Sequence, residues 1–444
     1  MFSLGMSPSN YPLFDKPDVW NNFALQRASQ GLLSLFLSLK QTPIITRYEA
    51  NSNMAYQLAK ELNYQIGFES SLFSFKNSDP QPVLLILDRK NDPVTPLLKQ
   101  WTYQPMIHDL FGINNGRVDL SRAPNIKPEY KEIVLSTEND DFFNKSMRLN
   151  FGDLGVSIKN YVNAFQDASK SNQKLDSIDD MKKFVENYPE FRKLSGNVSK
   201  HVTLVSELSR VVNERSLLYV SELEQSLACD SNNQFDEHMK QLGEMIGNNK
   251  IRSEEKVCCT LLFLLRYEKS ASIANASNFL KQELLKHHVS QDSIDMIDVV
   301  LMYASYKYRQ GDLFNNDNIF SRGKQALKRG LQGVENVYTQ HTPFYVDNLV
   351  KLIKENKPNS KIEQLFKLLP TNNSEVAASK LSYKARNRLI IVFFIGGITY
   401  SEHNDISKIK SQLGSEYGIN LIVGGTSIIN SKMFLQNLNN SFFS

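Results

Sequence analysis

The sequence has few of the features that mark a specialised class of protein. Its 444 residues include only 3 cysteines, Cys229, Cys258 and Cys259, too few and too irregularly spaced for a disulfide framework or a zinc site. Its 51 basic and 47 acidic residues nearly balance, which leaves a net charge of +4. This balance argues against a protein that binds nucleic acid through its overall charge. We therefore expect a reducing compartment and no nucleic-acid partner.

Long apolar runs are also missing. The longest, Leu32–Leu39 and Leu389–Ile398, are about half the length of a helix that crosses a bilayer. The first residues do not combine a basic segment with an apolar core, so they do not resemble a signal peptide. We expect a cytoplasmic chain that associates with membranes only peripherally, through a partner or a surface patch.

The chain does contain two separated groups of short apolar runs that predict β-strands. The first group is Pro43–Tyr48, Val83–Leu87 and Ile133–Ser136, and the second is Leu389–Ile395 and Ile419–Val423. Val83–Leu87 is apolar throughout, as a strand buried on both faces should be. Because helical patterns alternate with these runs, they indicate a parallel sheet with flanking helices.

The stretch from about residue 150 to residue 370 has an almost purely helical pattern. The sequence therefore predicts an α/β plus α fold, in which a large helical insertion splits the sheet domain. Residues 1–149 and 373–444 are predicted to form the two parts of the sheet domain. Residues 150–250 are predicted to form a helical hairpin region, and residues 251–372 a second helical region.

Acidic and basic side chains follow the second predicted strand. Asp88, Arg89 and Asp92 lie where that strand would leave the sheet. The two carboxylates could hold Mg²⁺ at the carboxyl end of a parallel strand, which would suit an enzyme that handles phosphate or nucleotides. The sequence lacks a glycine-rich phosphate loop followed by Lys and Ser or Thr. We favour a structural turn, in which Asp88 and Asp92 accept hydrogen bonds from Arg89 and loop amides, and we expect no catalytic residue, cofactor or metal.

Several ordered motifs, spread over nearly the whole chain, resemble the SM (Sec/Munc) family of SNARE regulators. They are Asp88–Ile113, FGDLGV at 151–156, SELEQSLAC at 221–229, GVENVYTQHTP at 333–343 and VGGTSIINS at 423–431. SELEQSLAC and GVENVYTQHTP are the most specific. They resemble the vacuolar-protein-sorting branch of the family, which serves endosomal and trans-Golgi traffic.

The resemblance implies a non-enzymatic regulator of vesicle docking and membrane fusion in endosomal, trans-Golgi or vacuolar transport. Its implied partners are syntaxin-type and R-type SNAREs, and its implied location is peripheral on endosomal, Golgi or vesicle membranes, as a monomer without a cofactor. Phe2-Ser3-Leu4 resembles the end of the family's first domain, which binds the syntaxin N-terminal peptide. We therefore expect that domain to be essentially absent, and an inactive scaffold fragment is a further alternative.

The family resemblance also implies that a helical hairpin in residues 150–250 binds SNARE helices. The residues expected to contribute are Tyr188, Pro189, Leu194, Val198, His201, Val205, Leu208 and Val212. Pro189 has two interpretations: it holds a bend in the hairpin, or it simply begins the helix that follows.

The apolar stripe on the second arm of the hairpin also has two interpretations. Val198, Val202, Val205, Leu208 and Val212 recur at the spacing of an amphipathic helix. Such a stripe packs inside a domain, or it stays partly exposed and accepts a partner's helix. A basic run further along the chain is similarly open, either as a solvated face or as a contact with anionic lipid or acidic SNARE residues. This run consists of Arg322, Lys324, Lys328 and Arg329.

Overall fold

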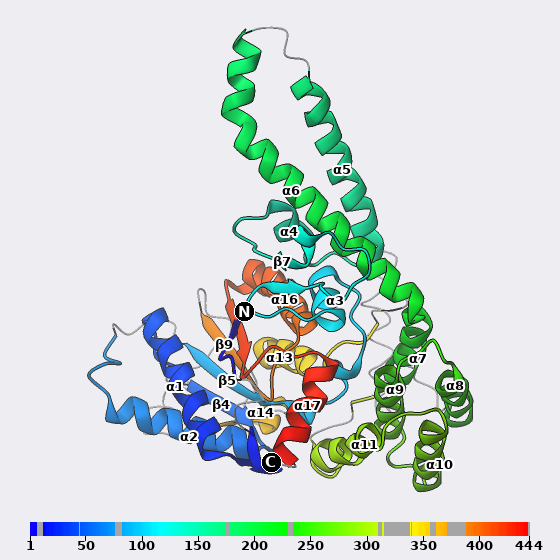
Figure 1. Cartoon of the computed structure of the whole chain (residues 1–444). Coiled ribbons are helices and arrows are strands. Elements are labelled where there is room, and N and C mark those ends of the chain that lie inside the picture. The colour runs from blue at the N-terminus through cyan, green and yellow to red at the C-terminus, as the bar shows by residue number, and fades with distance from the viewer. Residues whose placement is uncertain are drawn as a thin grey trace. The chain divides into compact units, whose positions relative to one another are not determined.

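The chain, drawn in Figure 1, divides into two compact units. The computed structural model describes residues 1–6, 12–43, 45–75, 82–173, 178–229, 234–309, 313–314, 338, 340–355, 361–370 and 388–442. Unit 1 comprises Met1–Leu98 and Val220–Ser444, and unit 2 comprises Lys99–Tyr219. The four segments predicted from the sequence divide the chain by its secondary-structure content, and their boundaries remain a prediction.

Unit 1 contains a six-stranded sheet built from both ends of the sequence. Its strands stand in the order β1 (Phe2–Ser3), β10 (Asn420–Gly425), β9 (Leu389–Ile395), β5 (Val83–Asp88), β4 (Ile45–Glu49) and β8 (Phe366–Leu368). All neighbours are parallel except β4 and β8. At the centre β5 pairs with β9, and Val83 lies opposite Ile390. The predicted fold class, a mostly parallel sheet split by a helical insertion, is confirmed.

Helices cover both faces of this sheet because the side chains of its central strands alternate between the two faces. Leu84 and Ile86 of β5 share one apolar core with α1 (Asn22–Leu39) and α2 (Asn53–Phe68). Leu85 and Leu87 share a second core with α13 (Phe344–Glu355) and α16 (Tyr400–Tyr417). Every residue of β5 and β9 is buried, which explains why their sequences are almost entirely apolar.

One predicted strand belongs to a different sheet. In the segment Ile133–Ser136, β7 (Glu132–Val134) pairs with β6 (Arg117–Asp119) in a separate antiparallel ribbon of unit 2. The expectation that it extends the main sheet is therefore wrong. Only Ile133 of β7 is buried, whereas Glu132 and Val134 are exposed, a pattern that fits a two-stranded ribbon rather than the centre of a sheet. A second ribbon, β2 (Phe14–Lys16) with β3 (Val19–Trp20), lies in unit 1.

The remaining elements are mostly helical. Unit 2 contains α3 (Tyr103–Leu110), η3 (Pro128–Tyr130), α4 (Asp141–Ser146), α5 (Phe151–Gln173) and α6 (Ile178–Glu214). The other helices are η1 (Arg89–Asn91), η2 (Thr95–Leu97), α7 (Leu217–Cys229), α8 (Phe235–Gly247), α9 (Ser253–Arg266), α10 (Ile273–Lys286), α11 (Gln291–Ala304), α14 (Lys361–Leu365) and α17 (Ser431–Phe442). Over the described ranges, we find no helix with an apolar stretch that could span a bilayer.

Candidate functional site

The two long helices of unit 2 form an antiparallel hairpin, visible in Figure 1 as the paired ribbons α5 and α6. At the start of α5 the side-chain oxygen of Asn150 accepts a hydrogen bond from the amide of Asp153, at 2.9 Å. Further along, the rings of Phe165 and Phe191 stack across the two helices, with their centroids 5.5 Å apart. The first contact caps the start of α5, and the second joins the two arms.

Pro189 lies in the interior of α6. The helix begins at Ile178, so the alternative in which Pro189 begins the helix is wrong. Proline has no amide hydrogen, and α6 therefore lacks one backbone hydrogen bond at this point. This local weakness is compatible with a bend, and a switch between bent and straight forms stays a prediction. The side chains of Tyr188 and Pro189 lie outside the described residues.

Most of the apolar stripe on α6 packs inside the protein. Val198 is 6 % exposed, Leu208 is fully buried and Val212 is 3 % exposed. Leu194 and Val205 are half-buried, and Val202 is the exposed member at 38 %. The stripe therefore contributes to the interior and leaves only part of its surface accessible, so direct contact with a partner at Leu208 or Val212 would require rearrangement.

His201 lies at the centre of a buried polar cluster that joins α6 to α3 and α4. Its Nε2 is 2.7 Å from Oδ2 of Asp140, and its Nδ1 is 2.7 Å from the hydroxyl of Tyr103. Asp140 also pairs with Lys200 and caps α4 by accepting the amide hydrogen of Phe143. The sequence analysis expected His201 to contribute to SNARE binding, whereas the structure buries it completely.

The electrostatics of this cluster fix its charges. Burial acts to raise the pKa of Asp140, but the bonds from His201 and Lys200 hold that pKa well below its usual value. Burial lowers the pKa of His201, although Asp140 opposes this effect. The carboxylate of Asp140 is thus ionised and fully bonded, and the cluster holds the middle of α6 against the base of unit 2. The role of the cluster is structural, because each of its polar groups is bonded to another member of the cluster.

A second buried histidine, His108, makes unit 2 sensitive to acid. Its Nδ1 accepts the amide hydrogen of Ile113 at 3.0 Å, so it must be unprotonated there. Burial lowers its pKa from 6.5 to about 4, despite an opposing effect of Asp109. The folded state therefore binds fewer protons than the unfolded state as pH falls below 6.5.

We predict that His108→Asn reduces the acid sensitivity of folding. Between about pH 7.5 and about pH 5.5, the wild-type chain should lose about 1 kcal/mol of unfolding free energy at His108 alone, and the variant should not. The asparagine oxygen can still accept the bond from Ile113. Urea unfolding of both chains at the two pH values measures the difference. Equal losses in both chains would contradict the prediction.

The turn after β5 is held by hydrogen bonds from several elements of unit 1. Asp88 accepts bonds from the hydroxyl of Ser52 at 2.5 Å, from the amide of Lys90 at 3.0 Å and from the hydroxyl of Tyr303 at 3.3 Å. Asp92 accepts the amide hydrogen of Thr95 at 3.0 Å and its hydroxyl hydrogen at 2.6 Å. Both carboxylates are therefore occupied by structural partners.

The sequence analysis expected Arg89 to donate hydrogen bonds to the carboxylates of Asp88 and Asp92, and this expectation was wrong. The Arg89 guanidinium pairs with Glu402 at 2.7 Å and donates to the carbonyl oxygen of Gly397 at 2.9 Å. It also donates to the backbone carbonyl of Asp92, at 3.1 Å. The expected acceptors were wrong because Arg89 reaches Glu402 and Gly397 from the far end of the sequence. The carboxylates of Asp88 and Asp92 have other donors, which include Ser52 and Tyr303 for Asp88 and Thr95 for Asp92. Glu402 had not been considered, although Thr399 and Glu402 have the spacing of a capping box.

Two of the sequence features cannot be placed. Most of GVENVYTQHTP and all of the basic run Arg322, Lys324, Lys328 and Arg329 lie outside the described residues. Within the part of the chain that is described, no three His, Cys, Asp or Glu side chains gather closely enough to hold a metal ion.

Comparison with known proteins gives consistent matches over nearly the whole chain. The Sec1 family model matches residues 1–437. Vacuolar protein sorting-associated protein 45 of Schizosaccharomyces pombe is 43 % identical over 425 residues, which cover 96 % of this chain and 73 % of that protein. The Homo sapiens protein of the same name is 43 % identical over 418 residues, or 94 % of this chain and 70 % of that protein.

A solved structure agrees with these sequence matches. The SM protein Vps45 in complex with the Qa SNARE Tlg2 matches 99 % of this chain and 73 % of that chain, with 43 % identity and a TM-score of 0.84. The similarity thus extends across the sheet and the helical insertion alike.

Proposed function

The chain belongs to the Sec1 family, the SM proteins, and from this membership we propose that it regulates SNARE-dependent vesicle docking and membrane fusion. The observation that carries the proposal is the match to Vps45 in its complex with the Qa SNARE Tlg2, which spans 99 % of this chain. A protein so similar over its whole length should bind a syntaxin-type SNARE in a similar way. By the same argument we propose R-type SNAREs as further partners and endosomal, trans-Golgi or vacuolar transport as the process.

The hairpin of unit 2 is the proposed contact for SNARE helices. Val202 is exposed, and the half-buried Leu194 and Val205 lie on the same helix. A partial apolar surface on a long helix suits docking of another amphipathic helix. Among the other proposed contact residues, Tyr188 and Pro189 lie in the part of α6 nearer its connection with α5, and the rest act through the packing of α6.

The proposed role is non-catalytic. The carboxylate of Asp88, the strongest candidate for a phosphate-handling enzyme, already accepts hydrogen bonds from Ser52, Lys90 and Tyr303. A metal ion there would have to displace these partners. We further propose that the chain works at the surface of endosomal or Golgi-derived membranes, where its SNARE partners reside.

Binding measurements test the proposed function directly. The purified chain is titrated with the soluble part of an endosomal Qa SNARE, with and without its N-terminal peptide, and with an isolated R-SNARE motif. We expect saturable binding to at least one of them, and weaker binding to a SNARE of the plasma membrane used as a control. No binding to any SNARE at low ionic strength, where electrostatic attraction is strongest, would contradict the proposal.

A further inference from the structure

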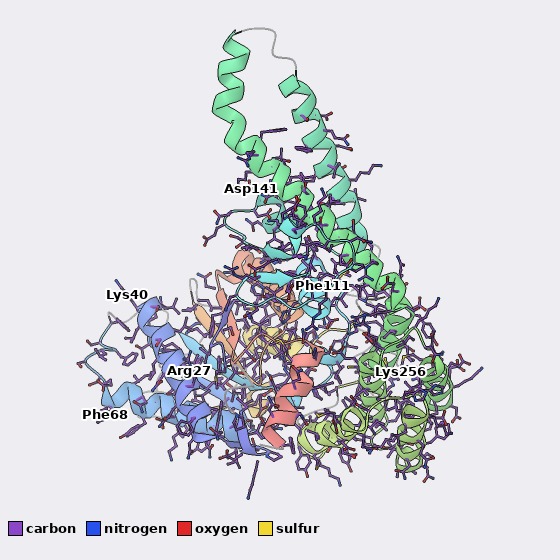
Figure 2. The ribbon with its side chains drawn as sticks, in the orientation of Figure 1. Arg27, Lys40, Phe68, Phe111, Asp141 and Lys256 are labelled. Carbon is purple, nitrogen blue, oxygen red and sulfur yellow. The ribbon has the colours of Figure 1, made fainter. Side chains whose placement is uncertain are left out.

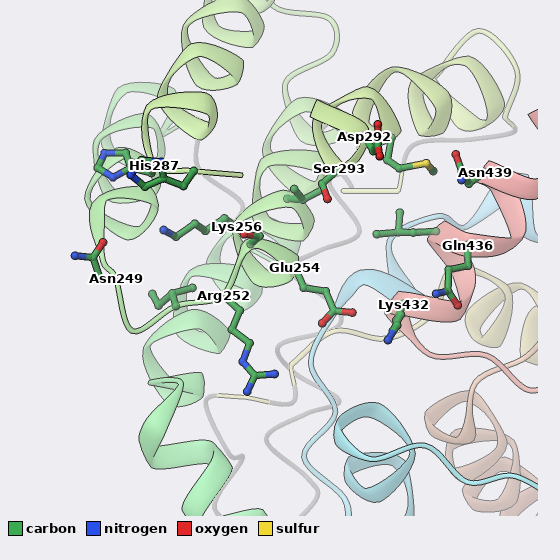
Figure 3. A pocket seen from close by; sticks show the side chains of 16 residues that line it. Asn249, Arg252, Glu254, Lys256, His287, Asp292, Ser293, Lys432, Gln436 and Asn439 are labelled. Carbon is green, nitrogen blue, oxygen red and sulfur yellow. The ribbon is translucent and has the colours of Figure 1, made fainter. Parts of the chain in front are cut away.

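A cavity of about 750 Å³ lies in unit 1, far in sequence from the hairpin (Figure 3). It is open to solvent and is bordered by the segment that enters α9, by the connection between α10 and α11 with the start of α11, and by α17. Its volume is in the range of cavities that hold small organic ligands. Neither the turn after β5 nor the hairpin uses any of its residues.

The cavity contains a buried lysine without a counter-charge. Lys256, labelled in Figure 2, lies on α9, a helix buried along most of its length, and is only 4 % exposed. Its ammonium has no ion-pair or hydrogen-bond partner among the described residues. Burial lowers its pKa from the usual value. The stem of Lys256 is therefore buried while its ammonium opens into the cavity, where an external anion can pair with it.

Other groups around Lys256 suit an anion. Figure 3 shows its ammonium pointing to the side of the cavity that carries His287 and Asn249. Arg252, which precedes α9, is exposed and makes no side-chain bond that caps the helix. The N-terminal end of α9 thus borders the cavity, and its dipole favours negative charge there, while Glu254 and Glu255 of the first turn oppose this effect.

The rest of the cavity is lined by acidic and neutral polar side chains. Glu254 and Asp292 lie on its other side in Figure 3, together with Ser293 and Gln436. Carboxylates repel a bare phosphate, but they accept hydrogen bonds from hydroxyl groups. The lining thus combines a cationic part with a part that suits a polyhydroxylated ring.

We propose that this cavity binds a phosphorylated polyol, with a phosphate group on Lys256 and His287 and ring hydroxyls on Glu254 and Asp292. Either a soluble inositol phosphate or the headgroup of a phosphoinositide lipid has this chemistry. The proposal is independent of SNARE binding, because it rests on unit 1 alone. Binding of a soluble ligand or of a membrane lipid at this cavity would then depend on the location of the chain in the cell.

Calorimetric titration of the whole chain with inositol 1,4,5-trisphosphate tests the soluble source. Sedimentation with phosphatidylcholine vesicles, with and without phosphatidylinositol 3-phosphate, tests the lipid source. We expect saturable binding in at least one arm. Lys256→Met should weaken it about 10- to 100-fold, as expected for the loss of a hydrogen bond to a charged group. Binding confined to one arm identifies the source.

The matched control is Lys240→Met, which removes the same charge from an exposed position on α8. It should bind like the wild type, and this result would separate the cavity from general surface charge. Methionine fits the buried path of the Lys256 side chain, so the melting temperature of Lys256→Met should be unchanged or higher. No saturable binding in either arm, or equal losses in the two variants, would overturn the proposal.

Discussion

Replacing Arg89 with methionine should lower the free energy of unfolding by about 3–5 kcal/mol. Arg89 is 1 % exposed and Glu402 is fully buried, so the variant would leave a buried carboxylate without its cation. The carbonyl of Gly397 would also lose its donor. Chemical denaturation of the wild type and the variant measures the loss.

The close packing around Arg89 sharpens this prediction. Gly396 has a φ of +87°, and a Cβ there would come within 2.7 Å of the Cβ of Arg89. Such a contact is too short for any other residue, so the turn after β9 is shaped around this side chain. Methionine keeps the Cβ and much of the stem, and the expected loss therefore comes from the charge rather than from the packing.

The double variant Arg89→Met with Glu402→Met is the control. It removes both charges, so it should be clearly more stable than Arg89→Met alone. If the double variant lost the sum of the two single effects, the pair would not be coupled, and our account of this contact would fail. The matched position Arg117, whose partner is Glu132, is exposed in unit 2, and Arg117→Met should cost less than about 1 kcal/mol.

The central strands could be predicted from the sequence because their environment is the same along their length. β5 and β9 are buried throughout, and both are apolar except for Asp88 at the end of β5. β1 and β8 were missed because two or three paired residues leave no periodic pattern. β7 was assigned to the wrong sheet, since a short apolar run does not reveal its partner.

The candidate site was less predictable than the fold because its contacts join distant segments. Arg89 and Glu402 are 313 positions apart, and His201 meets Asp140 across 61 positions. Sequence spacing favours local partners, so Arg89 was paired with its neighbours. The capping-box spacing of Thr399 and Glu402 was present in the sequence, but it predicts only a helix start. The second role of Glu402, as the partner of Arg89, depends on the sheet.

Replacing Leu208 with aspartate should destabilise the chain by several kcal/mol, on the order of 4 or more. The Leu208 side chain is fully buried, so the aspartate would place a negative charge in the interior without a cation to pair with it. Val202→Asp on the same helix provides the matched comparison, because Val202 is 38 % exposed. We expect that variant to keep nearly all of the stability of the wild type. Denaturant unfolding of both variants measures the contrast.

SNARE binding separates the two roles of the stripe. If the exposed part of α6 contacts a SNARE helix, Val202→Asp should weaken binding without unfolding, because the charge disrupts an apolar contact. Leu208→Asp should weaken binding only to the extent that unit 2 unfolds, and this can be read from its unfolding curve. Val202→Asp with unchanged affinity would remove this surface from the proposed contact, whereas a folded Leu208→Asp would show that α6 rearranges. With unchanged affinity of Val202→Asp, the stripe would serve only the stability of the hairpin. With a folded Leu208→Asp, it would serve a movement of α6.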